Sequence, residues 1–165
     1  MRRTGRTDQA LRLLDEARTH LTDTRPTAPV LDAAGMLALT AAYTAAQAHL
    51  PAPALHFAAL AEQTADQLTR LAAAPTEQTP WELSAPQCTL YRIGVHRELG
   101  DPDIALAHAR RLNTAELPTA ERRARAATDT ARALLATGDA AGAFAQLQHM
   151  KAAAPKRPTA RPCAP

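Results

Sequence analysis

The sequence predicts an all-α protein of about seven helices, in which antiparallel helix pairs stack on one another. Alanine supplies 41 of the 165 residues, and alanine and leucine are strong helix formers. The chain has only two valines, two isoleucines and five aromatic residues, so it has little material for the apolar face of a β-sheet. A short pattern that contains glycine also repeats along the chain, which is typical of helix pairs.

Apolar residues at helical spacing, with proline and glycine between them, divide the chain into helical segments. The segments are expected at about 7–22, 30–49, 54–73, 87–99, 102–112, 119–137 and 140–153. Gly100 and Gly138 follow the fourth and sixth segments, where glycine commonly ends a helix. Pro102 suits the first turn of the fifth segment, and Thr119 suits the N-cap of the sixth.

The internal repeat reads Gly-Asp-x-x-x-Ala, followed by Leu or Phe and a second Ala. It occurs at residues 100–107 and, 38 residues later, at 138–145. Glycine permits the left-handed backbone that ends one helix and reverses the chain. The small Ala105 and Ala143 then let the second helix of each pair approach the first closely. Because one pair cannot bury both of its faces, neighbouring pairs are expected to stack.

Two weaker copies of the pattern extend the repeat toward the amino terminus. Gly5 stands five residues before Ala10, and His49 stands five residues before Ala54, with histidine in place of glycine. Residues 7–22 are therefore expected to be the second helix of a pair whose first helix is missing. Weak self-association, as a homodimer, is expected through the flank that this leaves open.

Gly138, Ala143, Leu147 and Pro155 have the spacing of the inter-helix Gly, the Ala, the large residue and the closing Pro of a tetratricopeptide repeat (TPR). This unit therefore resembles a TPR, although the Trp, Gly and Tyr of the first TPR helix are not matched. The resemblance implies a short TPR-like α-solenoid, in which stacked helix pairs form an open groove.

Residues 90–101 and 117–125 are similar to the carboxy-terminal TPR-like region of Xre-type helix-turn-helix regulators of high-GC bacteria, with the resemblance best over 80–155. It implies a protein- or peptide-binding scaffold that serves as the sensing or interaction module of a bacterial transcriptional regulator. Such regulators also carry an amino-terminal DNA-binding domain, which has no counterpart in this sequence. Direct nucleic-acid binding by this chain alone is therefore not expected.

The net charge of +3 lies at the ends of the chain. Seven of the 19 basic residues fall within 1–6 and 151–165, and without them twelve basic and sixteen acidic residues remain, a net charge of −4. Since nucleic-acid binding needs basic side chains massed on one face, the body does not favour it. Residues 1–154 are expected to form one helical-repeat domain, and 155–165 a disordered, basic, proline-rich tail.

No residue pattern indicates catalysis, a metal or a cofactor. The six histidines form no HxxxH or HExxH pair, and there is no glycine-rich phosphate loop or nucleophile elbow. Cys88 and Cys163 are too few and too far apart for a disulfide framework or a zinc site. The sequence therefore predicts a cytoplasmic protein with reduced cysteines that is not an enzyme.

Residues 33–61 carry no charge and are numerous enough to span a bilayer. Pro51 and Pro53 would interrupt such a span, so two buried helices of a soluble protein, joined by a turn, are expected instead. The basic start of the chain has no apolar stretch behind it, which argues against a signal peptide.

The first helices of successive TPR pairs line a groove, and three sets of residues at helical spacing are expected to face it here. They are Met36, Tyr43, Gln47, Gln87, Leu90, Arg97, Arg125, Thr128 and Arg132. An aromatic residue with several Arg and Gln suits an extended or acidic peptide; the alternative is that these are ordinary surface and core residues. A second function, small-molecule or lipid binding, is less favoured because alanine-rich helices pack too closely to leave a large cavity.

Overall fold

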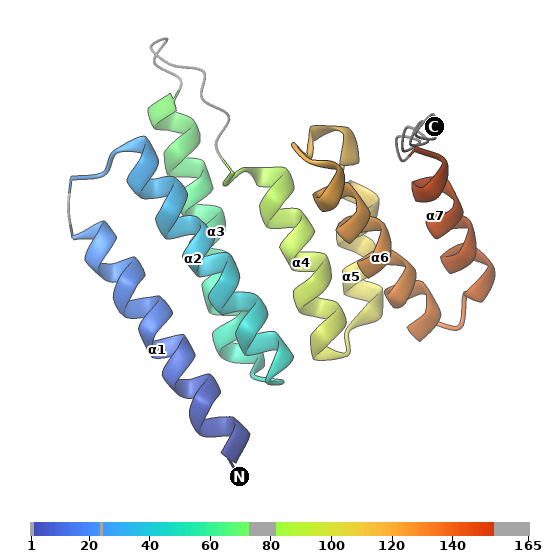
Figure 1. Cartoon of the computed structure of the whole chain (residues 1–165), viewed down its shortest axis with the longest axis horizontal. Helices are drawn as coiled ribbons and strands as arrows, with labels where there is room; N and C mark the ends of the chain where they lie inside the picture. Colours follow the sequence, from blue (N-terminus) through green and yellow to red (C-terminus); the bar gives the residue numbers. More distant parts are fainter. Residues whose placement is uncertain (1, 24, 73–81, 154–165) are drawn as a thin grey trace, which may run out of the picture.

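The computed structural model describes residues 2–23, 25–72 and 82–153, and within them every regular element is a helix (Figure 1). The α-helices are α1 Arg2–Thr22, α2 Ala28–Gln47, α3 Pro51–Ala72, α4 Ala85–Leu99, α5 Pro102–Arg111, α6 Ala120–Ala136 and α7 Ala140–Ala153. A short 3-10 helix, η1 (Thr114–Glu116), lies between α5 and α6. The all-α class and the seven helices are confirmed for this part of the chain. Pro155 and the tail expected at 155–165 lie outside the described residues.

The helices pack mainly against their neighbours along the chain. α2 contacts α1, α3 and α4, while α4 also contacts α3, α5 and α6. α6 in turn contacts α5 and α7. In Figure 1, α2, α4 and α6 lie side by side in one layer, with α3 and α5 behind it. In the rear layer, α3 thus packs on α2, the first helix of its own pair, and on α4, the first helix of the next pair. In the same way, α5 packs on α4 and on α6.

The core between α2 and α3 is built largely from alanine. Ala41, Ala42, Ala45 and Ala46 of α2 pack against Ala54, Phe57 and Ala58 of α3 and against Val95 of α4. Because these side chains are small, the backbones of α2 and α3 can approach closely over their length. Larger buried residues form a second cluster where α2, α3, α4 and the segment before α4 meet; they include Leu39, Leu68, Leu83 and Tyr91.

Three chain reversals share one backbone geometry and fall where the repeat places them. His49, Gly100 and Gly138 have φ angles of 56°, 87° and 86°. In each case the amide donates to the carbonyl three residues earlier, and the next amide donates to a carbonyl five residues before it, as in a Schellman motif. The alanine five residues after each reversal is buried: Ala54, Ala105 and Ala143.

The fourth expected reversal, at Gly5, is absent. α1 begins at Arg2, so Gly5 lies within the helix, and nothing lies within 4 Å of the Cβ that another residue would place there. The expectation that the first helix begins near Thr7 is therefore wrong. The repeat pattern misled here because no described helix precedes Gly5 for a turn to end.

The segment before α4 docks on α2. The Leu83 N–H donates to Asp32 Oδ1 at 2.7 Å, and the buried Leu83 side chain lies over Gly35, where a Cβ would overlap it. Ser84 then caps α4 by accepting a hydrogen bond from the Gln87 N–H at 3.3 Å. Thr119 caps α6 in the same way, as its position in the sequence predicts.

By length and composition, α2 is the one described helix that could cross a membrane. Core helices of soluble proteins pass the same test, and α2 packs against three other helices of this chain.

Candidate partner-binding face

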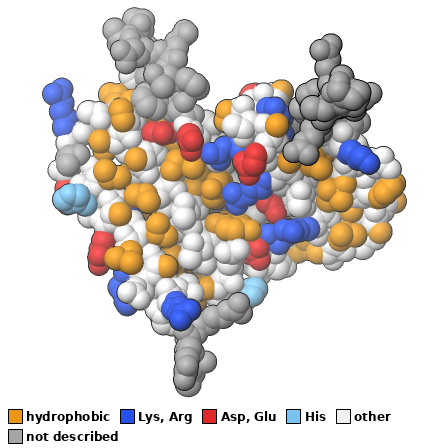
Figure 2. All heavy atoms as spheres, in the orientation of Figure 1, with side chains coloured by type: hydrophobic (Ala, Val, Ile, Leu, Met, Phe, Trp, Pro, Cys, Tyr) orange, Lys and Arg blue, Asp and Glu red, His pale blue; other side chains and the backbone are white. Residues whose placement is uncertain are grey.

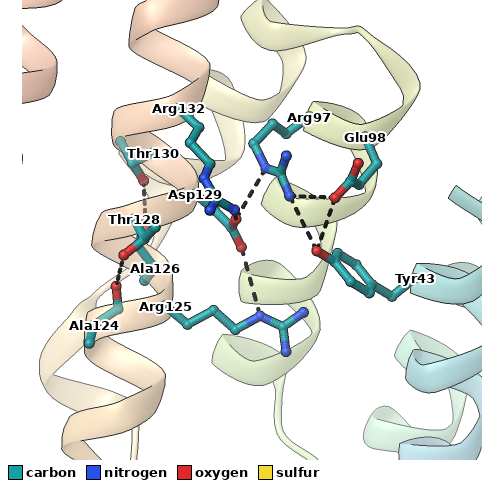
Figure 3. A network of polar contacts seen from close by, with 10 residues as sticks. All are labelled: Tyr43, Arg97, Glu98, Ala124, Arg125, Ala126, Thr128, Asp129, Thr130 and Arg132. Atoms are coloured by element: carbon teal, nitrogen blue, oxygen red, sulfur yellow. Dashed lines mark hydrogen bonds and ion pairs between the residues drawn. The ribbon is translucent and has the colours of Figure 1, made fainter. Parts of the chain in front are cut away.

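A network of charged and aromatic side chains joins α2, α4 and α6 across the layer that they form (Figure 3). We call it the α2–α4–α6 network. It consists of Tyr43 from α2, Tyr91, Arg97 and Glu98 from α4, and Arg125, Asp129 and Arg132 from α6. Because each helix belongs to a different pair, the network exists only when the pairs are stacked.

The Asp129 carboxylate lies at the centre of the network, with its side chain only 5% exposed. Its Oδ1 accepts a hydrogen bond from Arg97 Nε at 3.1 Å. Its Oδ2 lies 3.7 Å from Arg125 Nε and has no hydrogen-bond partner among the described residues. Arg132 Nη1 lies 4.0 Å from Oδ1. One buried carboxylate thus faces three guanidinium groups.

Tyr43 and Glu98 hold the other end of Arg97. Arg97 Nη2 donates to Glu98 Oε1 at 2.6 Å and to the Tyr43 hydroxyl at 3.2 Å. The Tyr43 hydroxyl donates to Glu98 Oε1 at 3.1 Å. Burial, together with the charge of Glu98 and the hydrogen bond to it, raises the pKa of Tyr43 above 10.0. The phenol therefore stays protonated and keeps α2 bonded to α4 at neutral pH.

Arg125 stacks on two tyrosines. Its guanidinium carbon lies 4.8 Å from the ring centre of Tyr43 and 4.4 Å from that of Tyr91, and the two rings meet edge to face at 6.4 Å. Such cation–π contacts hold the guanidinium in place. It makes no hydrogen bond to another described residue, and only its Nε takes part in an ion pair, with Asp129, so its Nη groups are available to an acceptor from outside.

Gly94 lets these side chains lie across α4. A Cβ at this position would lie 3.1 Å from Tyr43 Cε2 and 3.3 Å from Asp129 Oδ2, which is closer than most side chains allow. The absence of a side chain at Gly94 therefore lets a residue from α2 and one from α6 meet over the same turn of α4.

The network carries a surplus of positive charge, because it holds three arginines and two carboxylates. Arg132 is the most accessible of the charged groups, with 59% of its side chain exposed. Figure 2 shows basic and acidic side chains gathered at the middle of this face, with apolar side chains on both sides of them.

An open cleft of about 830 Å³ adjoins the network at Glu98. It lies between the start of α1 and the end of α2. The other residues that line it are Thr7, Asp8, Thr44, Gln47, Ala48, His49 and Leu50.

The structure brings together four of the residues expected to face a groove: Tyr43, Arg97, Arg125 and Arg132. Gln47 is exposed and lines the cleft instead. The hydroxyl of Thr128 donates to the Ala124 carbonyl of its own helix. Met36 is half-buried and packs against the core around Leu39.

Gln87 and Leu90 do not face a groove, because both are fully buried. The expectation that they line it is wrong. α4 is covered by α2, α3, α5 and α6, so the stripe to which they belong is closed off along most of the helix. Neither side-chain polar atom of Gln87 has a hydrogen-bond partner among the described residues.

Sequence reasoning missed Tyr91, Glu98 and Asp129. Asp129 could have been found, since it stands four residues after Arg125 and three before Arg132, which places all three on one helix face. Tyr91 and Glu98 each follow directly after a residue that was singled out, and adjacent helical residues point in different directions.

The described part of the chain holds no group of three or more His, Cys, Asp or Glu side chains that could bind a metal ion. Cys88 is buried, and burial, with the nearby charge of Glu62, raises its pKa to about 12. A thiol with this pKa is unreactive at neutral pH, because the thiolate is the nucleophile.

Comparison of the chain with protein-family models, with curated proteins and with solved structures finds no match. The α2–α4–α6 network must therefore be interpreted from its own geometry.

Proposed function

We propose that this protein binds an extended, acidic segment of a partner protein along the face formed by α2, α4 and α6. The proposal rests on the position of Arg125, whose guanidinium is fixed on the rings of Tyr43 and Tyr91. The N–H groups of this guanidinium make no hydrogen bond to another described residue. A carboxylate of the partner could accept from it and from the exposed Arg132. Charge-assisted hydrogen bonds of this kind are the stronger ones in proteins.

The cleft beside Glu98 extends the proposed binding face. A segment that placed a carboxylate on Arg125 could continue toward Gln47 and Thr44 in the cleft. Gln47 offers an amide to a peptide backbone, and the Thr44 hydroxyl, which donates to the Thr40 carbonyl, can still accept a hydrogen bond. An extended peptide suits a face that spans three helices. On this proposal, and on the resemblance to Xre-type regulators, the chain is a cytoplasmic interaction module of a bacterial regulator and not an enzyme.

A second candidate function is the binding of a small apolar molecule. A cavity of about 260 Å³ behind α6, lined mainly by α5 and α6 and including Leu106, Leu112 and Leu134, favours it. This volume is slightly below that of most ligand pockets, which commonly measure about 300–1,000 Å³. The peptide-binding proposal therefore takes precedence.

The proposal is tested by selecting peptides from a random library displayed on phage. We expect the selected peptides to be rich in Asp and Glu. Arg132→Ala should weaken the best peptide about tenfold or more, as expected for the loss of one charge-assisted hydrogen bond. Arg132 is preferred to Arg97 for this test, because Arg97 also bonds α4 to α2 and α6.

Arg12→Ala is the matched control, since it removes the same charge from an exposed site on α1. Fluorescence anisotropy with a labelled peptide gives the affinities, and circular dichroism confirms that each variant is folded. Selected peptides without an excess of acidic residues, or equal binding by Arg132→Ala and the parent protein, would contradict the proposal.

A further inference from the structure

The outer surface of α7 is unusually apolar. Phe144 is 66% exposed, the largest exposed fraction of any large apolar residue described. Leu147 on the same helix and Leu135 at the end of α6 are exposed as well. Figure 2 shows hydrophobic side chains gathered at the α7 end of the molecule.

α7 has few charged residues for a helix that is exposed on one side. Its inner side holds the buried Ala143, and its outer side carries Ala140, Phe144 and Leu147. From Ala140 to Ala153 it has no acidic residue and a single lysine, Lys151, and its other polar side chains are Gln146, Gln148 and His149. An exposed apolar patch of this kind commonly marks a contact with another protein.

The opposite end of the stack differs in this respect. Exposed positions of α1 include Arg6, Asp8, Gln9, Arg12 and Glu16, so α1 presents a mainly polar surface to solvent, in which Leu13 is an exposed apolar residue. Natural helical-repeat proteins close their ends with polar helices of this kind. α1 is therefore the more polar of the two terminal helices of the described structure, and α7 exposes the larger apolar side chains.

We propose that the outer face of α7 packs antiparallel against α7 of a second copy of this chain. Ala140, Phe144, Leu147 and Lys151 recur at helical spacing and form one stripe. The exposed Ala141 and Ala145 stand beside this stripe, so that Phe144 of one copy can pack between small residues of the other. Such self-complementary patches are what two-fold symmetric dimers require.

The charges at the two ends of α7 favour an antiparallel arrangement, in which a second copy of the chain covers the apolar stripe. Lys151 lies near the end of α7, and Asp139 stands just before its start. In an antiparallel pair centred near Ala145, Lys151 of each copy lies beside Asp139 of the other. A parallel pair would instead bring the two lysines together. Residues 154–165 offer no substitute, because they contain no large apolar side chain.

This surface is separate from the proposed peptide-binding face, because no residue of α7 belongs to the α2–α4–α6 network. It is also separate from the α1 flank through which the sequence predicts weak self-association. Each of the three surfaces can therefore be tested by its own variant.

The experiment measures the molar mass of the chain by size-exclusion chromatography with light scattering, from micromolar to millimolar concentration. We expect the mass to rise toward that of two chains. Phe144→Glu should weaken dimerisation about a hundredfold or more, because the dimer loses two buried rings and gains two buried charges. Its helical signal should not change, since Phe144 is largely exposed in the single chain.

Leu13→Glu is the matched control at the other end, where Leu13 of α1 is 59% exposed; it should leave the dimer intact. A second test is a zero-length carbodiimide cross-link between Lys151 and Asp139. Twelve residues of helix separate these two side chains by about 18 Å within one copy, so the link forms only between copies, as mixed isotope labelling can show. A monomer at every concentration, or a dimer lost with Leu13→Glu and kept with Phe144→Glu, would overturn the proposal.

Discussion

Gly35 of α2 and Gly5 of α1 both lie within helices, but their surroundings differ. A Cβ at Gly35 would lie 2.9 Å from Leu83 Cγ and overlap the methyl groups of that buried side chain. Nothing lies within 4 Å of a Cβ at Gly5. Since alanine forms helices better than glycine at either site, the two positions separate the cost of overpacking from the gain in helix propensity.

We expect Gly35→Ala to lower the free energy of unfolding by about 1–3 kcal/mol, because overpacking a closed contact outweighs helix propensity. Gly5→Ala should raise the free energy of unfolding by up to about 1 kcal/mol. Urea unfolding followed by circular dichroism measures both changes. If Gly35→Ala proved as stable as the parent protein, Leu83 would have to move aside without cost.

The residues of the candidate site show what helical spacing can and cannot predict. Spacing placed Tyr43, Arg97 and Arg125 on faces that meet, because a helical stripe is a local property of the chain. The burial of Asp129 depends on Arg97, which is 32 residues away on another helix. The burial of Gln87 depends on how many helices surround α4. Neither fact is contained in the local sequence.

At the scale of the elements, the turn pattern was the most informative part of the sequence. A left-handed residue followed five positions later by a buried alanine recurs at His49, Gly100 and Gly138. The same pattern failed at Gly5, because its physical meaning depends on a preceding helix. The repeat thus predicts helix pairs well only where both helices of a pair are present.

The contact between α4 and α5 includes a stacked pair of histidines. The rings of His96 and His108 lie 5.4 Å apart and nearly parallel, and His96 Nδ1 lies 3.5 Å from Asp101 Oδ2. Burial, and then the neighbouring His96, Arg92 and Arg111, lower the pKa of His108 below 6.5, while Glu62 acts in the opposite direction.

This lowered pKa predicts a loss of stability on mild acidification. Because His108 binds a proton less readily in the folded chain, the unfolded chain holds more protons, and stability falls as pH decreases from above 6.5 toward the folded pKa. The melting temperature should therefore be lower at about pH 5.5 than at about pH 7.5. The lowered pKa of Glu62 acts only below its ordinary value of 4.5 and lies outside this range.

His108→Gln should reduce this difference in melting temperature, while His20→Gln, at an exposed site on α1, should leave it unchanged. Differential scanning calorimetry at the two pH values is the appropriate measurement. An equal acid sensitivity in His108→Gln and the parent protein would assign the effect to other groups.

At the scale of the whole molecule, each helix packs mainly on helices near it in the chain. This is why the repeat pattern could predict the order of packing without knowledge of distant contacts. The character of the two ends could not be predicted in this way. Whether an end is polar or apolar depends on which side of α1 or of α7 is left exposed. That side is set by how each terminal helix packs against its neighbour.

The last prediction concerns residues 156–165, which lie outside the described residues. They contain three prolines, three basic residues and no large apolar side chain, so they can add little buried apolar area to the core. Deletion of 156–165 should therefore leave the melting temperature unchanged and should also leave the proposed α7 dimer intact. Thermal melting and light scattering on the shortened chain test both expectations. A melting temperature lower by many degrees would mean that this segment packs against the helices.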